Sequence, residues 1–308
     1  MTSENVLFEI VIGTYEKFLL GYGVEIQSDA FIMKPSFSVE AHHQTVKCIA
    51  SSAKYLASGS TDETIQLFNM NTRKEMGALL HHNGSVTSLT FHGSYLISCS
   101  EDNTICLWST NNWECLKTLQ GHKSGVNCIS VHPSGKMALS VSKDKTLRTW
   151  NLIKGRSAYV TNIKKDAELV QWSPDGSFFL ISHRNIVEIF SVENAAVLHT
   201  IDFQHKICDI TFLNDDVFAV AGEQDEVHLF SVKSGSLCNT IKAKTNRIKA
   251  VKAVKVNEES FLVTASSEGH IKVWHIDDSK PEWKIHKVGK VSTGCRPTCM
   301  TIIVKTSE

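Results

Sequence analysis

The sequence predicts an all-β protein, a seven-bladed β-propeller closed by pairing of its N- and C-terminal strands, and three observations lead to this prediction. First, an aromatic residue ends a run of alternating polar and apolar residues every 40 to 44 residues, at Phe68, Trp108, Trp150, Phe190, Phe230 and Trp274. This period is typical of four-stranded propeller blades and exceeds the roughly 33 residues of common helical repeats. Second, the apolar positions alternate with a period of two, as in half-buried strands. Third, apolar segments remain at both ends of the chain, outside the six repeats.

The repeat that ends at Trp108 shows the internal order of a blade. Residues 86–91 form a first strand, residues 95–100 a second, and residues 101–108 run through a turn into a third strand. Pro133-Ser134-Gly135 and Pro174-Asp175-Gly176 have turn-forming compositions. We therefore expect these two tripeptides to join first strands to second strands in later blades.

The two terminal segments supply the strands of a seventh blade. The segment Phe8 to Ile26 reads as strands separated by glycines, and Thr298 to Val304 reads as one further apolar strand. If these segments share a sheet, the ring closes and no sheet edge is left to pair with other molecules. We therefore expect residues 1–308 to form a single propeller.

Composition limits the classes of function. The 308 residues include 32 basic and 32 acidic side chains, so overall charge does not favour binding to nucleic acid or to an anionic membrane. Any basic binding surface must be local. No apolar run approaches the roughly 18 residues of a membrane-spanning helix, and Glu4 and Glu9 argue against a signal peptide, so we expect no membrane partner.

The nine cysteines show no regular spacing. Cys48 and Cys128 each follow a repeat-phased valine by two residues, where a small apolar side chain would be buried. We expect reduced thiols in a cytosolic or nuclear protein rather than a disulfide framework. Cys295 and Cys299, and the pairs His42-His43 and His81-His82, lack the spacing of zinc ligands, so we expect no metal site.

Three successive repeats carry the same polar residues ahead of the closing aromatic. The matched sets are His42, Ser58, Asp62 and Phe68; His82, Ser98, Asp102 and Trp108; and His122, Ser140, Asp144 and Trp150. At these residues the chain resembles the WD-repeat family, which implies a seven-bladed WD40 β-propeller in which histidine, serine, aspartate and tryptophan form a buried hydrogen-bonded tetrad. Such groups are costly when buried alone and satisfy one another when joined. In the first set Phe68 replaces the tryptophan, so that set loses its last donor.

The remaining repeats depart from this pattern, and nothing in the chain indicates catalysis. The repeats that end at Phe190 and Phe230 lack the histidine, while the last keeps Thr264 and Trp274 but has Glu268 in the aspartate position. We expect these blades to be locally less stable than the others. A Ser-His-Asp set repeated at matched positions in three blades is more typical of a structural brace than of a hydrolase, so we expect no catalytic residue and no cofactor.

Basic residues gather in the loops of the fourth and fifth blades. If the histidine loop meets the aspartate turn, both loops emerge at one end of the ring. These loops carry Lys123, Lys143, Lys145, Lys164, Lys165, His183 and Arg184. They either keep the surface solvated or bind an acidic peptide, a phosphorylated segment or an RNA backbone. A second basic stretch, residues 242–255, is expected to lie partly on an exposed strand face.

Longer segments carry a more specific resemblance. Residues 81–89, 113–117, 138–158, 172–176 and 264–274 are similar to the p21-activated-kinase-interacting WD-repeat proteins and their nucleolar relatives. The resemblance implies a nucleolar factor for large ribosomal subunit assembly, which in animals also negatively regulates the kinase. Those relatives continue into a long lysine-rich tail, whereas this sequence ends at Glu308.

Three functions are therefore open. The first is a non-catalytic scaffold in large (60S) ribosomal subunit biogenesis and pre-rRNA processing, monomeric, located in the nucleus and nucleolus, which binds assembly factors and pre-ribosomal RNA. The second is a signalling adaptor that binds and negatively regulates a p21-activated kinase. The third, a substrate receptor of a ubiquitin ligase, is less favoured because no helical adaptor-docking segment accompanies the repeats.

Overall fold

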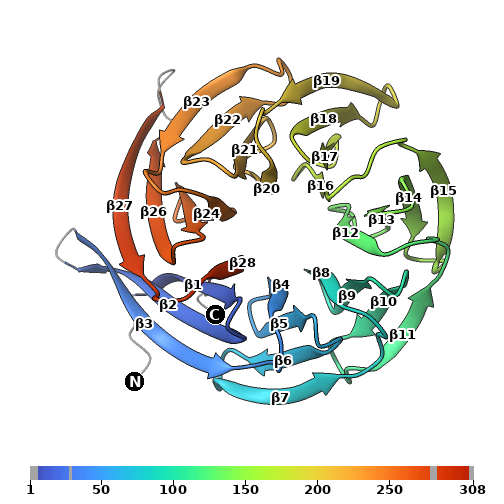
Figure 1. Cartoon of the computed structure of the whole chain (residues 1–308), viewed down its shortest axis with the longest axis horizontal. Coiled ribbons are helices and arrows are strands. Elements are labelled where there is room, and N and C mark those ends of the chain that lie inside the picture. Colours follow the sequence, from blue (N-terminus) through green and yellow to red (C-terminus); the bar gives the residue numbers. More distant parts are fainter. Residues whose placement is uncertain (1–5, 28–29, 278–282, 305–308) are drawn as a thin grey trace.

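The computed structural model describes residues 6–27, 30–277 and 283–304. Within these residues the chain forms 28 β-strands and no helix. The strands make seven four-stranded antiparallel sheets, arranged as blades around a central channel (Figure 1). The prediction of an all-β, seven-bladed propeller is confirmed.

The blades follow the chain in order, with the closing blade counted as blade one. Blade one contains β28 (Pro297–Val304), β1 (Val6–Thr14), β2 (Phe18–Gln27) and β3 (Ala30–Glu40). Blade two contains β4 (Val46–Ser51), β5 (Tyr55–Ser60), β6 (Ile65–Asn69) and β7 (Lys74–Leu79). Blade three contains β8 (Val86–His92), β9 (Tyr95–Ser100), β10 (Ile105–Ser109) and β11 (Cys115–Leu119). Blade four contains β12 (Val126–Val131), β13 (Met137–Ser142), β14 (Thr146–Asn151) and β15 (Arg156–Asn162).

The other three blades repeat this order. Blade five contains β16 (Leu169–Trp172), β17 (Phe178–His183), β18 (Ile186–Ser191) and β19 (Ala196–Asp202). Blade six contains β20 (Ile207–Phe212), β21 (Val217–Gly222), β22 (Glu226–Ser231) and β23 (Leu237–Lys242). Blade seven contains β24 (Ile248–Val256), β25 (Glu259–Ser266), β26 (His270–Asp277) and β27 (Lys284–Ser292). The first strand of each sheet faces the channel and the fourth lies on the outside (Figure 1).

Blade one joins the two ends of the described chain. Strand β1 pairs with β2 on one side and with β28 on the other, in a register that runs from Phe8 opposite Val304 to Gly13 opposite Cys299. The expected closure of the ring is therefore confirmed. The outer strand β3 lies beyond the expected segment and contains Pro35, which an edge strand tolerates because a proline lacks the N–H of a central strand.

The closing aromatics share a backbone irregularity. In all six repeats the pairing between third and fourth strands shifts at the closing aromatic, for example between Leu107 and Trp108 and between Thr149 and Trp150. Such a bulge re-aims the side chain at the irregularity. Trp108 and Trp150 are buried, with exposed fractions of 4% and 1%.

Adjacent blades share their apolar cores. One cluster joins Ile97 and Ile105 of blade three to Val126, Ile129 and Trp150 of blade four. A single blade therefore leaves apolar surface exposed until its neighbour packs against it, as expected of a repeat array. In the part of the chain that the structure describes, no helix is long or apolar enough to cross a membrane.

Candidate functional site

Blade four contains the complete hydrogen-bonded set of histidine, serine, aspartate and tryptophan, which we call the brace. His122 lies in the loop before β12, with Nε2 2.7 Å from Ser140 Oγ and Nδ1 2.9 Å from an oxygen of Asp144. Trp150 donates its indole N–H to Ser140 Oγ at 2.8 Å. Because the hydroxyl accepts from Trp150, it donates to His122 Nε2, and the proton on Nδ1 points at Asp144.

This geometry sets the charge of each partner. Burial lowers the pKa of His122 more than the nearby Asp144 raises it, so the imidazole stays neutral. Burial alone would raise the pKa of Asp144, but hydrogen bonds from Thr146, the Lys123 amide and His122 hold it well below its usual value. Ser140 has no exposed surface and its hydroxyl is fully engaged, so it is not available as a nucleophile.

Blades two and three contain the same brace with one difference. In blade three, His82 lies 2.8 Å from Ser98 Oγ and 2.9 Å from Asp102, and Trp108 donates to Ser98 at 2.8 Å. In blade two, His42, Ser58 and Asp62 form the corresponding contacts at 2.8 and 3.1 Å. Phe68 has no N–H to donate, so the blade-two set ends at Ser58.

Blade five leaves three buried polar atoms unpaired. Ser182 Oγ, Trp172 Nε1 and His183 Nδ1 are buried atoms without a hydrogen-bond partner. Blade seven keeps one link, from Trp274 Nε1 to Thr264 Oγ1 at 3.2 Å, and places the buried Lys272 ammonium against the Ala243 carbonyl oxygen. The expectation that these blades are less stable stays a prediction. In blade five its physical basis is these three atoms, whereas the described residues of blades two, four and seven each contain one such atom.

A second, backbone link fixes where the loops emerge. In six blades the first residue of the turn between second and third strands donates its N–H to a carbonyl in the loop before that blade, at 2.9 to 3.1 Å. The pairs are Tyr15 to Arg296, Thr61 to Thr45, Glu101 to Ser85, Lys143 to Gly125, Glu223 to Lys206 and Ser267 to Arg247. The link persists in blades without the histidine. It holds both sets of loops at one end of the ring, which we call the loop face.

The basic candidates occupy this loop face, with one exception. Lys123, Lys143, Lys145, Lys164, Lys165 and Arg184 are exposed in inter-blade loops or in turns between second and third strands. The assignment of His183 to the surface is wrong. Strand β17 extends through His183, whose side chain is buried at 4% exposure with Nε2 3.1 Å from Glu188. Only Arg184 and Asn185 are left to form the turn.

Two of the lysines are neutralised by carboxylates. Lys143 lies 2.7 Å from Glu101, and Lys165 lies 3.3 Å from Glu188. The hydrogen bond from Lys143 is the main reason that the pKa of Glu101 lies below its usual value. Within the described residues, no ion pair involves the other four cations, which we call the basic sector: Lys123, Lys145, Lys164 and Arg184.

The turns differ in charge but not in shape. The same turn position, with a positive φ of 63° to 72°, is occupied by Glu63 in blade two, Asn103 in blade three and Lys145 in blade four. The first residue of the same turn changes from Thr61 to Glu101 to Lys143. Since the backbone conformation is shared, the sector is distinguished by its side chains alone.

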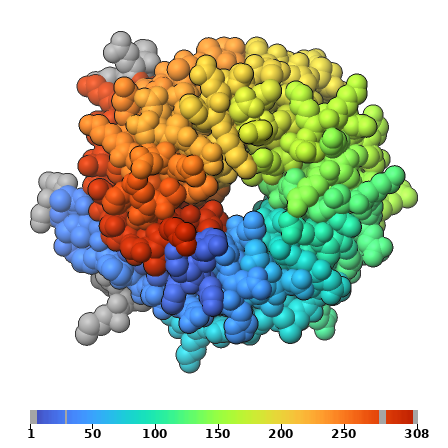
Figure 2. Space-filling model, viewed as in Figure 1, coloured from blue at the N-terminus to red at the C-terminus, as the bar shows by residue number. Residues whose placement is uncertain are grey.

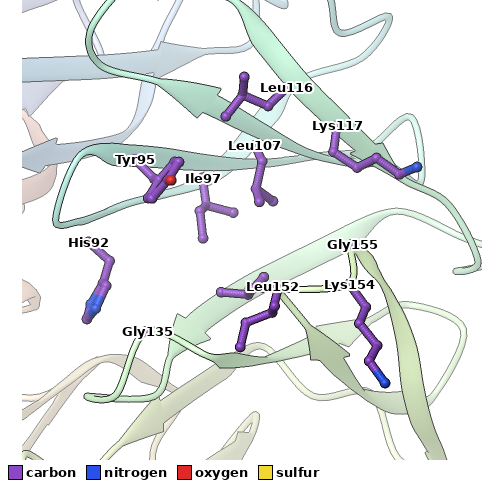
Figure 3. Close-up of a pocket in the computed structure, with 11 residues that line it drawn as sticks. His92, Tyr95, Ile97, Leu107, Leu116, Lys117, Gly135, Leu152, Lys154 and Gly155 are labelled. Atoms are coloured by element: carbon purple, nitrogen blue, oxygen red, sulfur yellow. The ribbon is translucent and has the colours of Figure 1, made fainter.

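A cavity lies on another part of the surface, between blades three and four. Figure 3 shows Tyr95 and Leu116 on one wall and Leu152 on the other. The cavity has a volume of about 530 Å³, and its exposed apolar lining residues include Tyr95, Leu116 and Ile153. These three side chains are 48%, 51% and 73% exposed. Lys117 and Lys154 supply the only charges among its lining residues, and no carboxylate or thiol is present to pair with His92 in acid–base chemistry.

The channel through the ring is open in the space-filling view (Figure 2). Its lining includes Lys249 and Lys252 from the second basic stretch, and Lys252 lies 2.9 Å from Asp209. Lys242 and Lys255 of that stretch pair instead with Glu226 and Glu258 at the surface. All nine cysteines are free thiols, and burial raises the pKa of the channel-lining Cys299 to about 12.

The fold, the braces and the closing aromatics define a WD-repeat propeller. The family model "WD domain, G-beta repeat" matches residues 33–69, 73–109 and 113–151. The mouse (Mus musculus) p21-activated protein kinase-interacting protein 1 is 46% identical over 301 residues, which cover 96% of this chain and 78% of that protein. Protein MAK11 of Saccharomyces cerevisiae is 30% identical over 98% of this chain and 84% of its own length. Shk1 kinase-binding protein 15 of Schizosaccharomyces pombe is 27% identical over 98% and 86%. The chain belongs to the family of p21-activated protein kinase-interacting WD-repeat proteins.

Proposed function

We propose that this protein is a non-catalytic interaction scaffold in the assembly of the large ribosomal subunit and in pre-rRNA processing, in the nucleolus. The resemblance to nucleolar WD-repeat proteins motivates this assignment. The observation that carries it is the basic sector, because a chain with no net charge places four unpaired cations on neighbouring loops of one face. Phosphates of pre-ribosomal RNA and carboxylates of assembly factors are the groups that such cations bind.

The cavity between blades three and four offers a second contact surface. An apolar side chain of a protein partner would cover Tyr95, Leu116 and Ile153, which are otherwise in contact with water. Lys117 and Lys154 at the same cavity favour acidic residues beside that apolar anchor. We therefore assign this surface to a protein partner and the basic sector to phosphate or carboxylate groups.

Co-sedimentation with large-subunit precursors tests the scaffold proposal. A tagged chain is expected to migrate with these precursors, and reversal of Lys123, Lys145, Lys164 and Arg184 to Glu is expected to release it. The control replaces four exposed lysines at the opposite end of the blades by Glu: Lys54, Lys136 and Lys233 in turns, and Lys74 at the start of β7. Absence of the unaltered chain from the precursors, or equal release by both variants, contradicts the proposal.

The names of two relatives support a second function. The mouse protein is named for interaction with p21-activated kinase, and the fission yeast protein for binding the Shk1 kinase. The second proposal is an adaptor that masks a regulatory segment of such a kinase. The purified chain is then expected to bind and inhibit a p21-activated kinase without other factors, and an unchanged kinase rate at saturating concentrations of the chain excludes this function.

A further inference from the structure

We propose that His81, Cys106 and Cys115 of blade three form a binding site for a thiophilic divalent cation, namely Zn²⁺. His81 lies in the loop before β8, Cys106 on β10 and Cys115 on the outer strand β11. Their ligand atoms all lie within 4.8 Å of one another. Among the residues that the structure describes, this is the one group of three or more histidine, cysteine or carboxylate side chains whose ligand atoms lie so close together.

The strand bulge brings the two thiols to the same side of the blade. Cys106 pairs with Thr118, and Trp108 pairs with Cys115. Cys115 and Thr118 are three residues apart, so in a regular strand they would face opposite sides of the sheet. The register shift at Trp108 leaves Leu116 as the extra residue, which returns Cys115 to the face of Cys106 and Thr118.

The hydroxyl of Thr118 lies among the three ligand atoms. It is 3.0 Å from His81 Nε2, 3.9 Å from Cys106 Sγ and 3.8 Å from Cys115 Sγ. Bond lengths of about 2.3 Å to sulfur and 2.0 Å to nitrogen place the ligands of a tetrahedral Zn²⁺ roughly 3.5 to 4 Å apart. Side-chain rotations that move the ligand atoms by about 1 Å therefore suffice to close the site. Thr118 or a water would take the fourth position.

The donor set favours zinc over hard cations. Two sulfurs and one imidazole nitrogen suit Zn²⁺, whereas Mg²⁺ and Ca²⁺ prefer oxygen ligands. His81 is exposed and gives the ion a path from solvent, while Cys106 is buried. Burial and the adjacent Cys115 raise the pKa of Cys106 to about 12, so this thiol is protonated until a cation displaces the proton.

The fold itself does not require these residues. The position of Cys106, opposite the brace serine, is occupied by Gln66 in blade two and Arg148 in blade four. The position of Cys115, opposite the closing aromatic, is occupied by Glu75 and Ser157. Neighbouring blades thus form the same brace with other side chains, so the three ligands are not part of the repeat architecture.

Titration of the reduced, purified chain with Co²⁺ tests the site. We expect one equivalent to bind with the sulfur-to-cobalt charge-transfer and visible bands of tetrahedral coordination, and Zn²⁺ to displace it. Cys106→Ser and Cys115→Ser are each expected to reduce the charge-transfer bands, because one of the two sulfur ligands is lost, and His81→Ala, at an exposed position, to weaken binding at least tenfold. Cys238→Ser, on the outer strand of blade six, is the matched control and is expected to bind as the unaltered chain does.

The thermal unfolding midpoint gives a second readout, since a ligand that binds only the folded state stabilises it. Excess Zn²⁺ is expected to raise the midpoint of the unaltered chain and of Cys238→Ser equally, and that of His81→Ala by less. Circular dichroism confirms that each variant is folded. Absence of the charge-transfer bands in the folded, reduced chain overturns the proposal. The proposal is also overturned if the His81, Cys106 and Cys115 variants bind Co²⁺ as tightly as the unaltered chain does.

Discussion

Trp150 donates its indole N–H to Ser140 Oγ at 2.8 Å, and this contact joins the closing aromatic of blade four to its histidine and aspartate. Loss of the hydroxyl in Ser140→Ala leaves the Trp150 N–H and His122 Nε2 buried without partners. In Ser58→Ala of blade two only His42 loses a partner, because Phe68 has no polar atom.

We therefore expect Ser140→Ala to lower the free energy of unfolding by about 1–3 kcal/mol more than Ser58→Ala does. Urea unfolding of the two variants measures the difference. Equal costs, or a larger cost for Ser58→Ala, would mean that the tryptophan adds nothing to the brace.

The braces make the protein sensitive to acid. The folded-state pKa values of His42 and His122 lie below the usual value. As the pH falls through about 6.5, these histidines are therefore protonated in the unfolded chain before they are protonated in the folded chain, and the folded state loses stability. The folded-state pKa values of Asp62, Asp102 and Asp144 also lie below the usual value. The stabilisation of the folded state by these three carboxylates is therefore fully present above about pH 4 and is lost as the pH falls further.

Stability is therefore expected to decrease in two stages between pH 7 and pH 3. Urea unfolding as a function of pH measures the profile. His122→Gln should reduce the first stage and Asp144→Asn the second, and a profile that is flat between pH 7 and pH 5 would contradict the neutral, buried histidines.

Blades five and six are expected to exchange amide hydrogens faster than blades two to four. Blade five holds the unpaired Ser182, Trp172 and His183 atoms, whereas blades three and four have complete braces. Hydrogen exchange followed by mass spectrometry resolves the blades. Faster exchange in blades two to four than in five and six would show that the braces do not govern local stability.

Closure of the ring depends on the small size of Gly13 on β1. A Cβ there would lie 2.6 Å from Val46 and 2.7 Å from Cys299, whereas one at Gly23 meets nothing closer than 3.7 Å. Gly13→Ala is expected to destabilise the protein by about 1–3 kcal/mol through overpacking. Gly23→Ala on β2 is the control, and equal thermal midpoints of the two variants would contradict this account of the β1–β28 contact.

The cavity between blades three and four is tested by adding charge to its apolar wall. Leu116→Asp and Ile153→Asp are expected to release protein partners while the thermal midpoint stays within a few degrees, because both side chains are more than half exposed. Leu198→Asp, at the matching position on β19, is the control. Affinity capture with quantitative mass spectrometry measures the loss, and unchanged partners in both cavity variants would remove this surface from the proposed function.

The sequence predicted the repeating parts of the molecule well because their period is fixed by geometry. The interval between Trp108 and Trp150 and the strand alternation are properties of every blade, so each repeat supports the others. The strand β3 was missed because Lys34 and Pro35 interrupt its apolar pattern. Its position as an outer edge strand, visible only in the sheet, explains why that composition is allowed.

The candidate surfaces were less predictable. His183 was misplaced because the change from strand to turn falls within one residue of it, and a shift of one residue reverses the direction of a side chain. The convergence of His81, Cys106 and Cys115 gave no signal, since it depends on a bulge at Trp108 and on a loop from elsewhere in the blade. The carboxylates that neutralise Lys143 and Lys165 likewise come from neighbouring strands and turns.

The most direct test of the proposed scaffold is the salt dependence of its binding to isolated large-subunit precursors. If the basic sector makes the contact, the affinity of the unaltered chain falls steeply as salt is raised, and reversal of Lys123, Lys145, Lys164 and Arg184 removes both the affinity and its slope. The reversal of Lys54, Lys74, Lys136 and Lys233 leaves both unchanged. Binding that is independent of salt, or equally tight for the variant with the reversed basic sector, would contradict the account.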